Sequence, residues 1–397
     1  MNVFKKIFCR IYQFGFKAAL PFLPYREPEL VDGFNKVPDI VRRKNIDSVL
    51  IVTDQGVYKL GLTKELEDAL SENGIKYAVY KDTVANPTTE NVEAAKDLYL
   101  ENACQALIAV GGGSAMDCAK GVGIRIVHPD KPLEHFAGVL KVRKKLPLFI
   151  ATPTTAGTGS ETTLAAVITD AKTHHKYPIN DFPLIPRYAV MHPEITFGLP
   201  PFFTATTGMD AMTHAVEAFI GRSTTAGTRA ASIKAVKLIS DNLITAYNEP
   251  TNYEARKNML HAAYLAGTAF TKSYVGYVHA VAHSLGGKYG IAHGLANSVL
   301  LPVVLKEYGS HAWKRLAILS RATGISADPS DELAANAFIA HIESMNRALG
   351  IPEKLEGIKE EDIPELAKTA DKEGNPLYPV PVLWDAKELE KIYRLVM

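Results

Sequence analysis

Apolar residues in the first half of the chain follow two alternating patterns. A short, β-branched apolar run at residues 48–53 predicts a buried strand, and further strands are predicted at 76–80, 106–110 and 146–152. Between them, residues 62–73 and 114–127 have helical spacing, and a third helix follows the turn at 86–89 and runs to about residue 102. This alternation predicts an α/β fold with a doubly wound, mainly parallel sheet.

The pattern changes after residues 193–201, beyond which strand signals are few. Helices are predicted at residues 202–220, 226–247, 253–270, 278–285, 312–323, 331–349, 360–369 and 385–395. The sequence therefore predicts two domains: an α/β domain at 1–195, which includes a helical extension at about 1–30, and an all-α domain at 196–397.

Composition narrows the classes of protein that the chain can belong to. The 397 residues are 47% hydrophobic and 22% charged, and the net charge of +1 gives no basic field for nucleic acid. Cys9, Cys104 and Cys118 are too few and too far apart for a disulfide framework, which favours a cytoplasmic protein. No segment predicts a membrane span, and we expect residues 1–30 to form an amphipathic helix packed on the body, with a peripheral membrane contact as the alternative.

Two glycine-rich turns follow predicted strands and could bind a dinucleotide. The first is GGGS at residues 111–114, which opens a helix, and the second is TPTTAGTGSE at 152–161. Glycine lets the backbone approach a phosphate, and the amides at a helix start attract the anion. Each turn alone could be a ligand-free connection, but two of them at strand ends favour nucleotide binding in the first domain.

Asp54 ends the first predicted strand. Its carboxylate could accept both hydroxyls of an adenosine ribose and would repel a 2′-phosphate, which favours NAD over NADP. The alternative is an aspartate that only caps a turn.

One carboxylate and several histidines gather in the second domain. Asp210 and His214 are four residues apart, as are His279 and His283, so each pair shares one face of a predicted helix. His293 follows a glycine-rich bend. Such a set could bind Fe²⁺, Zn²⁺ or another divalent metal with a position open for substrate, although spacing alone leaves open which of the last three histidines is not a ligand.

The motifs GGGSAMDCAK, TPTTAGTGSE, TGMDAMTHAVE and GYVHAVAHSLGGKYGIAHG resemble those of the iron-dependent, group III alcohol dehydrogenases, from Asp54 onward. The resemblance implies a dehydroquinate-synthase-like fold with the active site between its two domains. It also implies hydride transfer between a small alcohol or its aldehyde (or ketone) and NAD(H), with the metal as Lewis acid.

The resemblance also assigns residues to roles. It implies the metal ligands Asp210, His214, His279 and His293, with His283 as a nearby proton relay. It places around the cofactor Asp54, Asn86, Gly112, Gly113, Ser114, Asp117, Thr152, Thr155 and Lys176. Phe270 matches an aromatic position of the alcohol pocket, and Lys272 and Tyr274 would narrow that pocket or change its charge. We expect Lys272 to favour a substrate that carries a carboxylate or phosphate.

Several positions depart from the family pattern: His192 stands where aspartate is frequent, Ser284 where proline is frequent, and residues 271–274 where a smaller segment is common. Alternatives on the same fold are a dehydroquinate-synthase-type lyase and a zinc polyol dehydrogenase, such as one for glycerol. The chain lacks the basic cluster that the lyase needs near the metal motifs, and its ligand set argues against the second. A homodimer or larger homo-oligomer with a small alcohol or aldehyde as its partner is expected.

Overall fold

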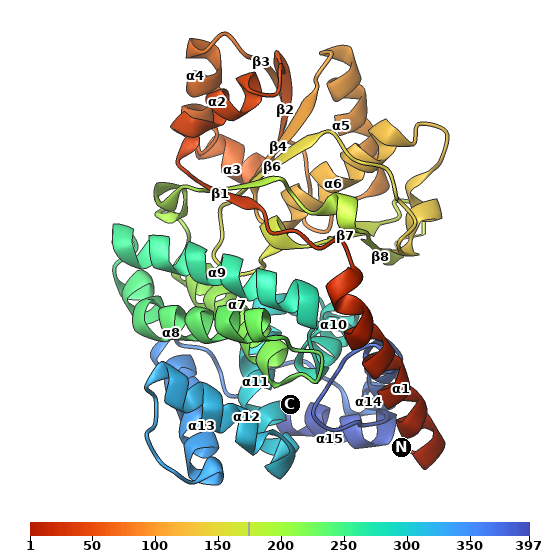
Figure 1. The fold of residues 1–397 in the computed structure, drawn as a ribbon, viewed down its shortest axis with the longest axis vertical. Helices are drawn as coiled ribbons and strands as arrows, with labels where there is room; N and C mark the ends of the chain where they lie inside the picture. Colours follow the sequence, from red (N-terminus) through yellow and green to blue (C-terminus); the bar gives the residue numbers. More distant parts are fainter. Residues whose placement is uncertain (174) are drawn as a thin grey trace. The chain divides into compact units, whose positions relative to one another are not determined.

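The computed structural model describes residues 1–173 and 175–397, which divide into two compact units (Figure 1). One unit comprises residues 24–198, and the other comprises residues 1–23 together with 199–397. The sequence assigned residues 1–30 to the α/β domain. That assignment is wrong for residues 1–23, because polar contacts hold the first helix on the helical unit.

The α/β unit contains a six-stranded sheet in the order β1-β9-β6-β4-β2-β3, and every pair in it is parallel. A smaller sheet, β5-β8-β7, has an antiparallel β7–β8 pair. The strands are β1 (Glu29–Asp32), β2 (Ser48–Val52), β3 (Lys76–Tyr80), β4 (Ala106–Gly111), β5 (Gly138–Val139), β6 (Leu148–Pro153), β7 (Ala165–Thr169), β8 (Lys176–Asn180) and β9 (Tyr188–Met191). The doubly wound parallel sheet predicted from the sequence is confirmed.

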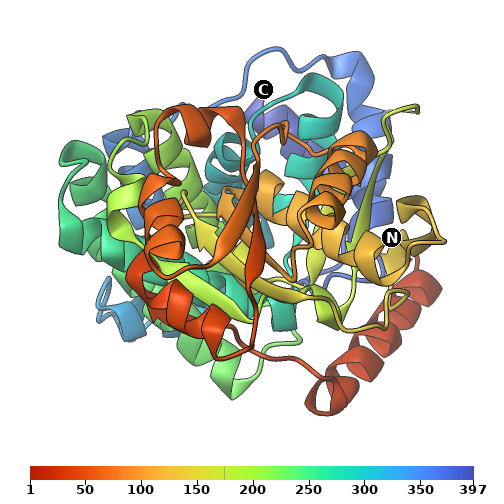
Figure 2. The ribbon, with the colours of Figure 1, turned by 90° about the horizontal axis from the view of Figure 1, so that it is seen from above.

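Helices cover both faces of the large sheet, which Figure 2 shows from above. They are α2 (Val37–Arg42), α3 (Gln55–Lys59), α4 (Lys64–Glu72), α5 (Thr89–Glu101) and α6 (Gly113–Val127). One apolar core lies between the sheet and α5 and α6, and another between the sheet and α2 and α4. Every residue of β2 and β4 is buried, as expected for central parallel strands covered on both faces.

In its 199–397 segment, the second unit is built from helices and contains no strand. Its helices are α7 (Pro201–Ile220), α8 (Ala226–Asn248), α9 (Tyr253–Ser273), α10 (Tyr277–Tyr289), α11 (His293–Tyr308), α12 (Ser310–Thr323), α13 (Asp331–Ala348), α14 (Ile363–Gly374) and α15 (Ala386–Val396), together with α1 (Val3–Ala19). None of the helices in the described residues combines the length and the hydropathy needed to cross a bilayer.

Helix α7 forms the centre of this unit, because all residues from Met209 to Ile220 are buried. Helix α11 crosses α7 closely at Gly294, where an added Cβ would lie 2.5 Å from the carbonyl oxygen of Thr206. A glycine is therefore required for α11 to begin against α7. This contact sets the position of His293, the first residue of α11.

Candidate functional site

A group of four side chains in the helical unit could hold a metal ion. Asp210 and His214 come from α7, His279 from α10, and His293 from the start of α11. One ligand atom from each residue lies within 4.8 Å of the ligand atoms of the other three. The structure thus brings together the four residues that the family resemblance selected.

The chemistry of these donors suits a divalent metal. Burial lowers the pKa of His279 well below its ordinary value and that of His293 to about 4, so both rings are neutral at physiological pH. Neutral imidazoles and one carboxylate are ligands that Fe²⁺ and Zn²⁺ accept. The arrangement therefore fits a metal better than it fits a cluster of ion pairs.

Glu217, which the sequence reasoning missed, holds His279 in place. Its carboxylate lies 2.6 Å from Nδ1 of His279 and accepts hydrogen bonds from the backbone amides of Gly276 and Val278, both at 2.8 Å. With Nδ1 engaged, Nε2 of His279 is left to face the other donors. Burial raises the pKa of Glu217 to about 7. The sequence signal was its position three residues after His214, on the same side of α7.

Asn297 is a second residue that the sequence reasoning missed. Its amide nitrogen lies 2.7 Å from Oδ1 of Asp210, 3.2 Å from Nε2 of His279 and 3.0 Å from Nε2 of His293. Asn297 follows His293 by four residues on α11, so the two share one helix face. The side chain of Asn297 therefore contacts three of the four candidate ligands.

His283 lies beside this group but is not part of it. Its Nδ1 is 2.6 Å from a carboxylate oxygen of Glu373, and its ring stacks on that of His293 at 5.1 Å between centroids. Burial alone would lower the pKa of His283, but the Glu373 carboxylate outweighs this effect and the pKa is raised. No sequence pattern indicates Glu373, because 90 residues separate it from His283.

The three residues expected around the alcohol pocket have different surroundings. Phe270 stacks on His214, with ring centroids 4.1 Å apart and planes 16° apart, so it lies directly against the metal candidate. Lys272 is half-buried in the last turn of α9. Tyr274, which follows α9 with a φ of 62°, packs edge-on against Phe16 of α1.

The glycine-rich turns lie at the carboxyl ends of neighbouring parallel strands. Asp54 follows β2, Gly112 follows β4, and the 154–159 turn follows β6. The chain runs outward from β2 to β3 and then returns to β4 on the other side of β2, so the direction of winding reverses between β2 and β4. Open α/β sheets bind nucleotides at such a reversal.

The first glycine-rich turn lies beside threonines of the second. A Cβ added to Gly112 would lie 3.8 Å from Oγ1 of Thr155, and one added to Gly113 would lie 3.7 Å from the side chain of Thr158. The Gly113 position begins α6, whose first amides are available to an anion. Thr152 is completely buried at the end of β6.

The other predicted cofactor residues bond to protein groups. Lys176 donates to Oδ1 of Asn86 at 2.8 Å, and the amide of Asn86 donates to Oγ of Ser114 at 3.3 Å. Asp54 caps α3 by accepting a hydrogen bond from the amide of Val57 at 2.9 Å. Capping a turn was the alternative to ribose binding in the sequence analysis. Asp117 accepts from Oγ of Ser160 at 3.2 Å and from the amide of Val167, so it fixes the second turn.

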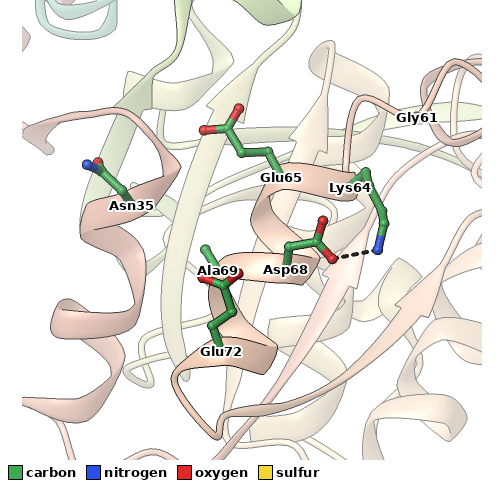
Figure 3. Close-up of a pocket in the computed structure, with 7 residues that line it drawn as sticks. All are labelled: Asn35, Gly61, Lys64, Glu65, Asp68, Ala69 and Glu72. Carbon is green, nitrogen blue, oxygen red and sulfur yellow. Dashed lines mark hydrogen bonds and ion pairs between the residues drawn. The ribbon is translucent and has the colours of Figure 1, made fainter.

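A cavity of about 550 Å³ lies elsewhere on the α/β unit, beside α4 (Figure 3). It is lined by Asn35, Gly61, Lys64, Glu65, Asp68, Ala69 and Glu72. Lys64 and Asp68 form an ion pair there. None of the predicted metal or cofactor residues lines this cavity, so we assign it no part in the chemistry.

Comparison with known proteins matches two family descriptions to the chain. Residues 31–193 match "Iron-containing alcohol dehydrogenase", and residues 204–397 match "Fe-containing alcohol dehydrogenase family, C-terminal". The 1,3-propanediol dehydrogenase of Citrobacter freundii is 38% identical over 350 residues, which cover 87% of this chain and 90% of that protein.

Solved structures agree with these matches. A 1,3-propanediol oxidoreductase has a TM-score of 0.91 at 35% identity and covers 94% of this chain and 100% of its own. A sulfoacetaldehyde reductase from Bifidobacterium kashiwanohense, solved in complex with NAD+, has a TM-score of 0.84 at 29% identity. The match covers 94% of this chain and 98% of that one. The expected dehydroquinate-synthase-like fold and the metal-dependent, NAD-linked alcohol dehydrogenase chemistry are thereby confirmed, and neither alternative enzyme gains support. The chain belongs to the iron-containing alcohol dehydrogenase family.

Proposed function

We propose that this enzyme interconverts small primary alcohols and their aldehydes, with NAD(H) as cosubstrate, at an iron site formed by Asp210, His214, His279 and His293. The observation that carries the proposal is the convergence of these four donors within 4.8 Å of one another. Iron held there supplies Lewis-acid chemistry, and NAD(H) supplies the hydride acceptor or donor.

The residues around the donors have separate tasks in this proposal. Phe270 forms an apolar wall against His214 and excludes water from one side of the alcohol. Glu217 keeps Nε2 of His279 directed at the metal position, because the carboxylate holds Nδ1. His283, held by Glu373, takes up or delivers the proton that accompanies hydride transfer.

The cofactor is proposed to bind at the glycine-rich turns of the α/β unit. Backbone amides at Gly112, Gly113 and Ser114 would hold the diphosphate, and Thr152 and Thr155 would donate from the second turn. Asp54, which follows β2, and Asn86, which precedes α5, would contact other parts of the cofactor. Lys176 holds the side chain of Asn86 through a hydrogen bond. Asp117 positions the second turn through Ser160.

The substrate class is proposed from the pocket residues. The relatives named above act on a propanediol and on an anionic aldehyde. Lys272 and Tyr274 on this chain favour a polar or anionic substrate over a long apolar one. An unchanged aldehyde profile and an unchanged KM in Lys272→Ala would remove Lys272 from this assignment.

Removal of single ligands tests the reaction itself. Asp210→Ala and His279→Ala should each abolish iron binding and reduce NADH-dependent aldehyde reduction to background, while the fold stays intact by circular dichroism. Full activity in either variant would contradict the proposed site. We further propose that the enzyme is cytoplasmic, which agrees with its three buried, unpaired cysteines. We also propose that it is a homo-oligomer.

A further inference from the structure

Helix α1 has the reverse of the usual orientation of an amphipathic helix on a protein surface. Its buried side consists of Cys9 and Gln13. Its outer side carries the exposed side chains Val3, Phe4, Ile7, Phe8, Ile11, Tyr12 and Phe14. An ordinary surface helix turns its apolar face toward the core, so this exposed face needs an explanation.

Specific polar contacts fix α1 in this orientation. Gln13 donates to the carbonyl oxygens of Pro376 and Tyr378, at 3.1 and 2.7 Å, and Arg10 donates to that of Val380 at 2.8 Å. Lys5 pairs with Asp371 at 2.8 Å. Because these bonds all arise from one side of the helix, rotation to bury the apolar face would break every one of them.

The exposed side chains form one continuous face. Phe4, Phe8 and Ile11 are spaced by four and three residues, as are Ile7, Ile11 and Phe14, so they form adjoining rows along α1. The side chains of Phe4 and Phe14 are 85% and 73% exposed, and Phe22, just beyond the helix, is 87% exposed. Contiguous apolar surface of this kind marks an interaction site.

The charges of α1 indicate what this face contacts. The helix contains Lys5, Lys6, Arg10 and Lys17 and no acidic residue. Lys6 and Lys17 are exposed and lie three residues from Val3 and Phe14, at the border of the apolar face. A wide apolar face with aromatic residues and a basic border is typical of helices that lie in the surface of an anionic membrane.

The shared chemistry of the family does not account for α1. The family match begins at residue 31, so α1 lies outside the part of the chain that resembles the iron-containing alcohol dehydrogenases. We propose that α1 is a docking surface for anionic lipid, through which the enzyme binds peripherally to a membrane.

Vesicle co-sedimentation of the full-length enzyme tests this proposal. Vesicles of phosphatidylcholine with about 30% phosphatidylglycerol should bind the wild type, pure phosphatidylcholine vesicles should bind it more weakly, and high salt should release it. The double variant Phe8→Glu, Ile11→Glu should bind at least about tenfold more weakly, since each side chain loses its apolar burial. Lys6→Glu with Lys17→Glu should remove the preference for the anionic vesicles.

A control variant carries the same kinds of substitution, one apolar residue to glutamate and one lysine to glutamate, elsewhere on the helical unit. Leu333 on α13 is 57% exposed, and Leu333→Glu with Lys314→Glu should leave vesicle binding unchanged. Circular dichroism and aldehyde reduction should show that all variants are folded. Equal sedimentation of the wild type and the Phe8→Glu, Ile11→Glu variant would overturn the proposal. A smaller oligomer in that variant without lipid would also overturn it, because a second copy of the chain would then cover the face.

Discussion

Glu217 is the residue on which the orientation of His279 depends. It combines a 2.6 Å contact to Nδ1 of His279 with two backbone hydrogen bonds at the start of α10. A buried carboxylate with three partners has a fixed position, and so has the ring that it contacts.

We therefore predict that Glu217→Gln weakens iron binding about 10- to 100-fold, because the amide cannot accept from all three donors. Metal affinity measured by competition with a chelator checks this, with the exposed Glu332→Gln as control. Wild-type affinity in Glu217→Gln would show that His279 needs no such support.

His283 allows a prediction that separates proton transfer from metal binding. His283→Gln should lower kcat about a hundredfold, the usual effect of losing a general acid or base, and should leave the iron content unchanged. Elemental analysis and steady-state kinetics on one preparation measure both quantities. Loss of iron in this variant would instead make His283 part of the metal site.

Sequence patterns identified the donors but not the residues that hold them. The four-residue spacings of Asp210 with His214 and of His279 with His283 indicated a metal site, and the family motif then selected His279 and His293 over His283. Glu373 depends on a contact between helices far apart in sequence, which no local spacing can show, whereas Asn297 lies only four residues after His293 on α11. Asp54 had two interpretations, and the hydrogen bond that it accepts from the amide of Val57 supports the one in which it caps a turn.

At the scale of elements, the position of α11 relative to α7 decides where His293 lies. The added Cβ of Gly294→Ala would come within 2.5 Å of the carbonyl oxygen of Thr206, and neither backbone can move freely. We predict a loss of about 1–3 kcal/mol in unfolding free energy and weaker iron binding.

Urea unfolding and metal titration check this prediction, with Gly227→Ala as the control variant. An added Cβ at Gly227 has 3.9 Å to its nearest neighbour, so this control should be close to neutral. Equal stability of the two variants would mean that the α7–α11 crossing tolerates a methyl group.

The elements that were predicted correctly are the long or strongly patterned ones. The central strands β2, β4 and β6 were found because they are continuous apolar runs. Strands β1, β7, β8 and β9 have four or five residues each and give little periodicity. Helix α11 was missed because Gly294 and Pro302 interrupt its helical pattern.

The sequence predicted that α1 is an amphipathic helix packed on the body, but it did not predict which face of the helix meets the body. Periodicity shows that a helix has two faces, but it does not show which one meets the body. Here the polar side found carbonyl and carboxylate partners on the segment after α14 and on α14 itself.

For the molecule as a whole, Glu161 should be one source of the pH dependence of stability. This residue lies in the second glycine-rich turn, and complete burial raises its pKa from 4.5 to about 7. Glu161 is then protonated in the folded state at a pH where the unfolded chain is already ionised. Its contribution is fully present below pH 4.5 and is lost as the pH rises through 7.

We predict that Glu161 contributes a fall of roughly 3 kcal/mol in unfolding free energy across this range. Glu161→Gln should remove this contribution and leave the similar one of Glu217, whose pKa is also raised to about 7. Urea unfolding at about pH 5 and about pH 7.5 measures it. Burial lowers the pKa of Lys120 to about 8, so Lys120 affects the pH dependence of stability only above the pH range of Glu161. A fall of the same size in Glu161→Gln and in the wild type would assign the pH dependence to other groups.

The most direct test of the central claim is the metal content of the enzyme together with its dependence on that metal. After anaerobic purification, elemental analysis should find about one iron per chain. Chelation should abolish NADH-dependent aldehyde reduction, and added Fe²⁺ should restore it in the wild type but not in His293→Ala. A metal-free protein that reduces aldehydes at the full rate would contradict the account.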